Sequence, residues 1–192
     1  SRGLGDVYKR QMCDCAIRAQ KAGVDIIQIH GDRLVGSLCS TILNKRNDKF
    51  GGSLENRTRF AIQLVKSLKE AVPNMPIDYK FSVVTPQRGK GGINLDEAPT
   101  FAKWLEEAGV DMLHVAQANH TGNMADTIPP MGVQPYGFFV DIAGQIKKSV
   151  NIPVSTVGRI FNPKMAESIL ESNKADIIGL GRILLADPDW IN

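Results

Sequence analysis

The sequence has 192 residues, of which 43% are hydrophobic and 22% charged, and a formal net charge of +3. This length suits one globular domain, and the composition excludes a disordered polyelectrolyte. No basic block and no apolar run of the ~20 residues that span a bilayer is present, so we expect neither a nucleic-acid-binding nor a membrane-bound protein. The three cysteines are too few for a disulfide framework or a zinc site. They predict no metal site and a reducing, cytoplasmic setting.

The first eleven residues, SRGLGDVYKRQ, show no helix or strand period that continues into the pattern starting at Met12. We therefore expect residues 1–11 to be a non-native extension, and residues 12–192 to form the folded unit.

Helix-like and strand-like segments alternate from Met12 onward. Ser53 and Asn162 have the side chains of N-caps, whereas Gly23 and Gly109 are typical of helix ends. In chain order we expect a helix ending near Ala22, a strand over 25–30, a helix over 54–71, a strand over 77–83, a helix capped by Asp96 and ending at Ala108, a strand over 111–116, a helix over 138–150, a strand over 153–157, a helix from Pro163 and a strand over 175–180.

An internal repeat supports this alternation, because AGVDIIQI at residues 22–29 returns as AGVDMLHV at residues 108–115. Strands separated by helices pair in parallel, as in doubly wound sheets and in closed barrels. Polar side chains near the carboxyl ends of the strands favour the active face of a TIM (β/α)8 barrel. Such a barrel needs about 250 residues, and the sequence shows only five strands. The expected fold is therefore of the α/β class, an incomplete TIM (β/α)8 barrel.

Two glycine–arginine turns follow the last two predicted strands, Gly158-Arg159 in VGR and Gly181-Arg182 in LGR. A glycine lets backbone N–H groups approach an anion closely, and arginine adds a bidentate phosphate donor. Either turn alone could be a tight turn with a solvated arginine. Since barrels often hold a phosphate between their last two strand loops, the pair predicts one phosphate cradle.

Two histidines lie where predicted strands end. His30 is followed by Gly31-Asp32-Arg33, and the nearby cation favours oxyanion or carboxylate binding over a purely structural histidine. For His120, in QANHTGN, the sequence favours a solvent-exposed loop residue and a site residue equally. His114 lies within a strand and is interpreted as structural.

The segment GGSLENRTRF at residues 51–60, with Asn44, Arg46 and Asp48 before it, resembles the signature of the Old Yellow Enzyme family of FMN-dependent oxidoreductases. The resemblance is to its NADH:flavin oxidoreductase / 2,4-dienoyl-CoA reductase branch, and it extends through AGVDIIQIHG, IPVSTVGRI and ADIIGLGRILLADPDW. It implies an FMN-binding (β/α)8 barrel of which this chain carries strands 4 to 8 with their helices. It also implies NAD(P)H as reductant, and an iron–sulfur cluster and FAD held by parts absent from this chain.

The resemblance assigns roles to several positions. Lys80 takes the place of the cation near the flavin N1/O2 edge, and Gly158, Arg159, Gly181 and Arg182 match the FMN phosphate loops. His30 matches the first member of the family's substrate-binding pair, and His120 resembles a histidine near the substrate of dienoyl-CoA reductases.

The second member of the substrate-binding pair is Arg33 here, where relatives have His or Asn, and the loop from His30 to Asn44 is about two residues shorter than in many relatives. Because a guanidinium pairs well with a carboxylate, we hypothesise that Arg33 selects an anionic or thioester-bearing substrate.

The resemblance thus implies a flavin-dependent reductase of an activated C=C bond, with His30, Arg33 and His120 as catalytic residues. One alternative is an amine dehydrogenase or demethylase of the same family. A second is a flavin-free, phosphate-binding isomerase or synthase barrel. We expect a small-molecule substrate, a homo-oligomeric full-length protein, and no activity from this fragment alone, whose open barrel would favour aggregation or dimerisation.

Overall fold

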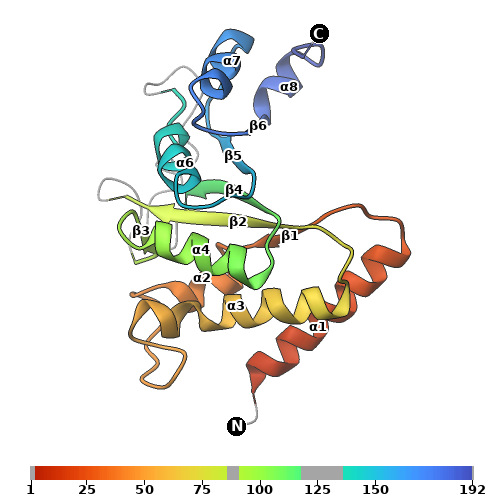
Figure 1. Ribbon diagram of the computed structural model, residues 1–192, viewed down its shortest axis with the longest axis vertical. Coiled ribbons are helices and arrows are strands. Elements are labelled where there is room, and N and C mark those ends of the chain that lie inside the picture. Colours follow the sequence, from red (N-terminus) through yellow and green to blue (C-terminus); the bar gives the residue numbers. More distant parts are fainter. Residues whose placement is uncertain (1–2, 86–90, 118–135, 192) are drawn as a thin grey trace.

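The structure is a computed structural model and describes residues 3–85, 91–117 and 136–191 (Figure 1). Helices and strands alternate along most of the chain. The elements are α1 (Leu4–Lys21), β1 (Ile27–His30), α2 (Leu34–Cys39), α3 (Leu54–Ala71), β2 (Ile77–Val84), β3 (Ile93–Asn94), α4 (Ala98–Ala108), β4 (Met112–Gln117), α6 (Val140–Lys147), β5 (Val154–Val157), α7 (Pro163–Glu171), β6 (Ile177–Gly179) and α8 (Arg182–Ala186).

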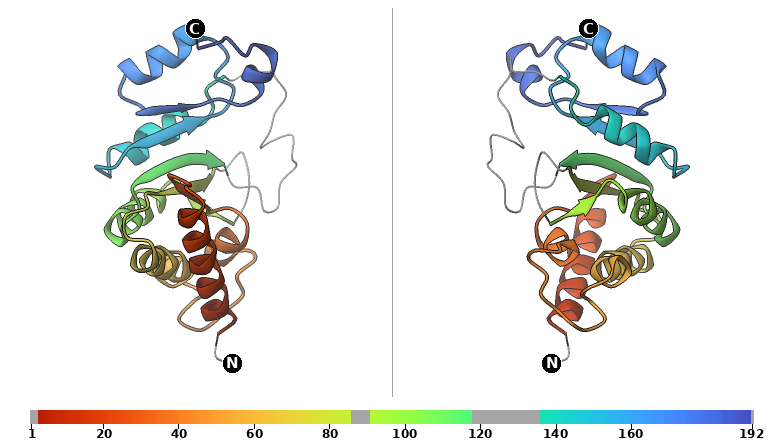
Figure 2. Two further views of the ribbon diagram at one scale, coloured as in Figure 1. Left: turned by 90° about the vertical axis from the view of Figure 1, so that its right-hand side faces the viewer. Right: turned by 90° about the vertical axis from the view of Figure 1, so that its left-hand side faces the viewer.

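One parallel sheet organises the molecule, with the strand order β1-β2-β4-β5-β6 and with β3 paired to β2. Each long strand lies beside the next one along the chain, which is the order of a barrel and not of a doubly wound sheet. Within the described residues, β1 and β6 are the two open ends of this path. Figures 1 and 2 show them well apart, at either end of the strand series. The predicted incomplete TIM barrel is confirmed.

The main core lies between one face of the sheet and the helices. Alternate side chains of β2, among them Tyr79 and Phe81, are no more than 1% exposed. Their ring centroids lie 6.0 and 5.4 Å from that of Phe101 of α4. From α3, Leu64 and Val65 fill the same core at 0% exposure. The opposite, concave face of the sheet carries polar side chains, as the alternation along the strands predicts.

Local signals set the helix boundaries. The Ser53 hydroxyl accepts a hydrogen bond from the backbone N–H of Asn56, and the Asn162 side chain accepts one from the backbone N–H of Met165. Both predicted N-caps are confirmed. The predicted Asp96 cap is wrong: α4 begins two residues later, and its Asp96 N–H is instead held by the Asn94 side chain.

The sequence shows no helical period before Met12, but the first helix begins at Leu4. Residues from Leu4 onward continue without interruption into α1. Tyr8 packs against the core, and Lys9 contacts Gln63 of α3.

Three short elements, α2, β3 and α8, were not predicted from the sequence. Each has six residues or fewer. A period cannot be recognised over so short a segment, so these elements form where neighbouring structure supplies their contacts.

Candidate functional site

Four polar residues form a row across the concave face, one from each of four neighbouring strands. The strand register pairs His30 with Lys80, Lys80 with His114, and His114 with Ser155. Residues paired in register point to the same face of a sheet. The predicted site residues His30 and Lys80 are therefore brought together, and His114 joins the same row.

His30 is held in one tautomer by the loop that follows it. The backbone N–H of Asp32 donates a hydrogen bond to His30 Nδ1, at 3.3 Å. A neutral ring with Nδ1 as acceptor carries its proton on Nε2. Desolvation lowers the pKa of His30, and the positive charge of Lys80 lowers it further, against the opposing effect of Asp32. At neutral pH His30 is thus an Nε2–H donor without a formal charge.

The glycine after His30 places the loop tightly against β2. A Cβ on Gly31 would lie 2.3 Å from the Lys80 carbonyl oxygen and 2.5 Å from the Tyr79 ring. The chain therefore needs glycine at this position to turn from β1 into α2, whose N-cap is Arg33.

Arg33 and His30 line a common pocket of about 500 Å³ between α1, β1 and α3. The rest of its lining is mainly aliphatic. Among the described residues no Phe, Tyr or Trp side chain lines this pocket. Arg33 is exposed, so its guanidinium is available to a ligand at the mouth of the site.

The signature residues Asn44 and Arg57 make hydrogen bonds inside the protein near this loop. Asn44 donates two hydrogen bonds, to the carbonyls of Leu38 at 2.6 Å and of Phe50 at 2.7 Å. These bonds tie the end of α2 to the start of the signature segment.

Arg57, also from the signature, is 3% exposed. Its Nε donates to the Cys39 carbonyl at 3.1 Å, and its Nη2 lies 2.5 Å from Glu97 Oε1. The signature therefore holds the end of α2, the helix that follows the loop carrying His30 and Arg33.

The two glycine–arginine turns lie side by side. Val157 of β5 pairs with Gly179 of β6, so the segments that follow both strands leave the same edge of the sheet. Gly158 has φ 114°, and Arg159, which is 5% exposed, has φ 53°. A non-glycine residue in the left-handed region is uncommon and marks a turn under constraint.

Gly181 is open to its surroundings. A Cβ on Gly181 would meet no atom within 4 Å, and the exposed Arg182 begins α8 beside it. The structure thus brings Gly158, Arg159, Gly181 and Arg182 to adjacent loops at one edge.

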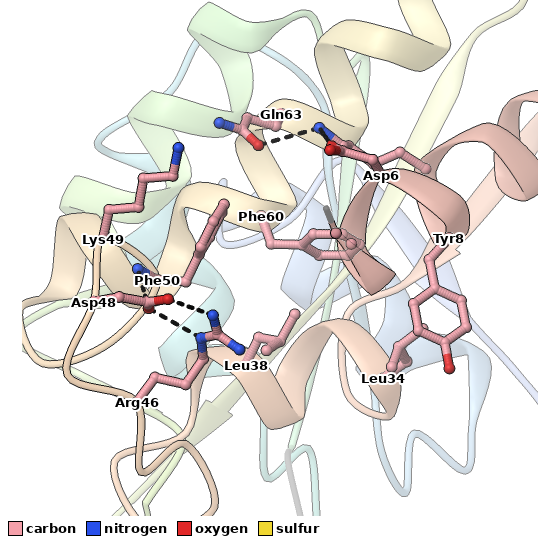
Figure 3. A pocket seen from close by; sticks show the side chains of 13 residues that line it. Asp6, Tyr8, Leu34, Leu38, Arg46, Asp48, Lys49, Phe50, Phe60 and Gln63 are labelled. Carbon is pink, nitrogen blue, oxygen red and sulfur yellow. Dashed lines mark hydrogen bonds and ion pairs between the residues drawn. The ribbon is translucent and has the colours of Figure 1, made fainter. Parts of the chain in front are cut away.

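A larger pocket of about 690 Å³ opens in the helical layer, between the start of α1, α2 and the loop before α3 (Figure 3). Phe50 and Phe60 face it, and Arg46 pairs with Asp48 at its rim. Part of its wall comes from Gly3 to Lys9. None of the site residues predicted above lines this pocket, so we do not assign the site to it.

His120 lies outside the described residues. In the described part of the chain, no group of His, Cys, Asp and Glu side chains is arranged to hold a metal ion, and no helix combines the length and hydropathy needed to cross a membrane.

Sequence reasoning did not single out Asp78 or Ser155 as site residues. Both lie on the concave face, where Asp78 accepts a hydrogen bond from Gln28 and Ser155 bonds His114. The signal that could have found Asp78 is the two-residue alternation of polar side chains in β2, whereas β5 has adjacent polar residues and gives no such signal for Ser155.

Comparison with known proteins gives a consistent assignment. Residues 7–192 match the family model of the NADH:flavin oxidoreductase / NADH oxidase family. The chain is 59% identical over 180 residues to a bilirubin reductase of Mediterraneibacter gnavus (strain CC55_001C), covering 93% of this chain and 28% of that protein. It is 42% identical over 185 residues to a bilirubin reductase of Clostridium symbiosum (strain WAL-14163), covering 93% of this chain and 49% of that protein.

Among solved structures, histamine dehydrogenase from Rhizobium sp. 4-9 matches with a TM-score of 0.82 and 27% identity, covering 98% of this chain and 27% of that one. The chain therefore spans half or less of the length of the relatives it matches.

Proposed function

Because the chain belongs to the NADH:flavin oxidoreductase / NADH oxidase family, we propose that it forms part of an FMN-dependent reductase that uses NAD(P)H to reduce an activated C=C bond. The observation that carries this proposal is the shared concave face, where Lys80 lies in register with His30 and the two glycine–arginine turns follow β5 and β6. The remaining barrel strands would come from sequence outside this chain.

The residues present fit FMN at both ends. The turns at Gly158-Arg159 and Gly181-Arg182 leave the paired strands β5 and β6 at one edge of the sheet, which is where barrels often hold a phosphate. Arg159 and Arg182 would add guanidinium donors to the phosphate. Lys80, at the other end, would face the flavin ring edge that becomes negative on reduction. The chemistry supplied by bound FMN is hydride transfer, from NAD(P)H to the flavin and from the flavin to the alkene.

His30 and Arg33 would act on the substrate. The neutral His30 Nε2–H would donate to the carbonyl oxygen conjugated with the alkene, and this bond would strengthen as negative charge develops there. Arg33 would pair with a carboxylate of the substrate. His120 would deliver the proton to the α-carbon.

We further propose a conjugated tetrapyrrole such as bilirubin as the substrate class, supported by the 59% identity to a bilirubin reductase. Bilirubin carries conjugated C=C bonds and carboxylates, which suit His30 and Arg33.

Amine oxidation is the second candidate, since histamine dehydrogenase shares the fold at 27% identity. A cationic amine would be favoured by aromatic side chains around it. The described lining of the His30 pocket contains no Phe, Tyr or Trp and includes the cationic Arg33, which disfavours such a substrate.

The test is made on the full-length protein. It is expected to bind FMN and turn yellow, and to oxidise NADH or NADPH when bilirubin is added anaerobically. A protein that stays colourless with excess FMN would refute the proposal. If it binds FMN but oxidises histamine and leaves bilirubin unchanged, the second candidate replaces the first.

Two variants examine the assigned residues. His30→Ala is expected to lower kcat by about 10²-fold, the usual effect of losing one donor to a developing oxyanion. Arg33→Ala is expected to slow reduction of a carboxylate substrate much more than of a matching uncharged enone. Equal losses on both substrates would remove Arg33 from substrate selection.

The resemblance also implies an iron–sulfur cluster and FAD in other parts of the full-length protein, a homo-oligomeric state and a cytoplasmic location. These stay part of the proposal. Iron and flavin analysis, and light scattering of the full-length protein, are the direct measurements.

A further inference from the structure

The aspartate of the internal repeat joins two neighbouring strands where they begin. Asp111 directly precedes β4, and its Oδ2 accepts a hydrogen bond from the backbone N–H of Ile77, the first residue of β2, at 2.8 Å. The backbone N–H of Asp111 donates in turn to the Ile77 carbonyl at 2.9 Å. Asp111 therefore holds the first residue of the adjacent strand at two points.

Asp176, directly before β6, makes the same two bonds. Its Oδ2 accepts from the backbone N–H of Val154, the first residue of β5, at 2.9 Å, and its N–H donates to the Val154 carbonyl at 2.8 Å. A lysine from the last turn of the helix before the held strand also bonds each carboxylate, Lys69 at 2.6 Å and Lys147 at 2.7 Å. We call the pair of backbone bonds made by Asp111 or Asp176 the aspartate clamp. Each clamp ties a strand to the one before it in the sheet.

Asp25 is the counterpart of Asp111, since AGVD occurs at residues 22–25 and 108–111. The backbone before both aspartates has the same form. Gly23 and Gly109 have positive φ, and the N–H of the valine after each glycine bonds the carbonyl five residues earlier, at 3.1 and 3.0 Å. Asp25 is exposed, and within the described residues its carboxylate has no hydrogen-bond or ion-pair partner.

Apolar residues beside Asp25 are exposed where their counterparts in the clamps are buried. The residue before the aspartate is 2% exposed at Val110 and at Ala175, whereas Val24 is 45% exposed. Ile26, on the other side of Asp25, is 52% exposed. In the part of the chain that the structure describes, β1 pairs with β2 on one side and is an open end of the sheet on the other. Exposed apolar side chains at a strand edge of this kind indicate a surface that another segment covers.

The pocket of about 500 Å³ lies along this edge of β1. Its lining includes every residue from 26 to 30 but, among the described residues, none of β2. Consecutive strand residues point to opposite faces, so together they line a pocket at the edge of the strand. α1 adds Met12, Ala16 and Ala19 to the lining. Since His30 ends β1, the proposed substrate contacts belong to one end of this pocket, and Asp25 lies before the other end.

We propose that the free edge of β1 is the docking surface of a parallel β-strand of the full-length protein, and that Asp25 clamps the first residue of that strand. The inference rests on the proposed function, under which the remaining barrel strands lie outside this chain. The chain covers 28% and 49% of the two bilirubin reductases it matches, which leaves room for such a strand. The two observed clamps give the direction, because each holds the residue that begins a strand running parallel to its own neighbour.

The experiment is hydrogen exchange of the full-length protein, resolved to single backbone amides by mass spectrometry. Asp25→Ala removes the carboxylate acceptor. One amide at the start of a strand outside residues 1–192 should then exchange about tenfold faster, the effect of losing one hydrogen bond to a charged group. Asp25→Asn keeps an acceptor oxygen and should restore most of the protection. Asp111→Ala is the positive control and should release the amide of Ile77, whereas Asp141→Ala, on α6 with a side chain 81% exposed, should release none.

A second measurement leaves the clamp intact. In the full-length protein, Val24→Cys should react with a small thiol reagent at least about tenfold more slowly than Asp141→Cys. The physical reason is that a docked strand would bury position 24 as Val110 and Ala175 are buried. The wild-type protein, whose own cysteines include the exposed Cys15, is the blank.

If Asp25→Ala changes the exchange of no amide outside residues 1–192, or if Val24→Cys reacts as fast as Asp141→Cys, the proposal is overturned. Loss of protection in β6, with Val24→Cys protected only at high protein concentration, would mean that a second copy of the chain occupies the edge, and the proposed occupant is then wrong. Should Asp25→Ala fail to fold, the labelling of Val24→Cys decides. Neither measurement needs FMN, so a colourless protein that shows both effects refutes the proposed function and leaves the clamp standing.

Discussion

Replacing Arg57 by methionine should destabilise the protein strongly, because Arg57 makes its bonds inside the core. The substitution keeps the apolar stem but removes the bonds to the Cys39 carbonyl and to Glu97. Breaking a buried ion pair costs about 3–5 kcal/mol. The Glu97 side chain is 25% exposed and can be rehydrated in part, so we expect the lower end, about 3 kcal/mol.

The measurement is urea unfolding of the full-length protein, followed by circular dichroism. With a slope of about 2 kcal/mol per molar urea, a loss of about 3 kcal/mol lowers the midpoint by about 1.5 M. Lys174→Met is the control, because Lys174 pairs with Asp141 at 46% and 81% side-chain exposure. Exposed pairs contribute about 0–1 kcal/mol, so this midpoint should move by less than about 0.5 M.

If Arg57→Met and Lys174→Met shift the midpoint equally, the structural role assigned to the signature arginine is wrong. A substrate KM that rises in Arg57→Met while FMN affinity holds would further support the view that this residue supports the His30–Arg33 loop.

Three further predictions follow from single positions. Gly158→Ala should lower stability by about 1–3 kcal/mol and weaken FMN binding, because φ is 114° and the new Cβ would lie 2.7 Å from the Phe139 ring; unchanged urea midpoint and FMN titration would refute the strained turn. Leu64→Ala should cost about 2–5 kcal/mol, since Leu64 is 0% exposed in the core, and a thermal midpoint equal to wild type would contradict this packing. Burial lowers the pKa of His30 and of His114, so the unfolded chain binds protons more readily and stability should fall as the pH drops below about 6.5. His30→Gln should lessen that fall, and a wild-type urea midpoint that rises on acidification would show that the sign is wrong.

Much of the secondary structure could be predicted from the sequence because it depends on local patterns. The helix over 54–71 has an N-cap at Ser53 and an apolar face at helical spacing, and α3 has these bounds. The five predicted strands are present; those at 25–30 and 111–116 are short, largely apolar segments that follow the helix-ending Gly23 and Gly109. The pairing of His30 with Lys80 on one face could also be expected, since side chains alternate along strands and parallel strands end at the same edge.

Other features depended on contacts between distant parts of the chain. Arg57 reaches Glu97 across 40 positions of sequence, and His114 reaches Ser155 across 41. No local pattern reports such a pair, because the sequence does not show which residues the strand register brings opposite each other. The start of α1 and the short elements α2, β3 and α8 were likewise decided by packing.

For this protein, the sequence by itself determined the alternation of helices and strands, the parallel sheet and the family signature, because these depend on neighbouring residues and on periods of two or 3.6 residues. Only the tertiary structure decided that the signature arginine is buried between the end of α2 and Glu97, and that His114 lies on the same face as Asp78 and Lys80. The physical reason is that burial and charge proximity are properties of the assembled sheet, where residues about 30 positions apart become direct neighbours.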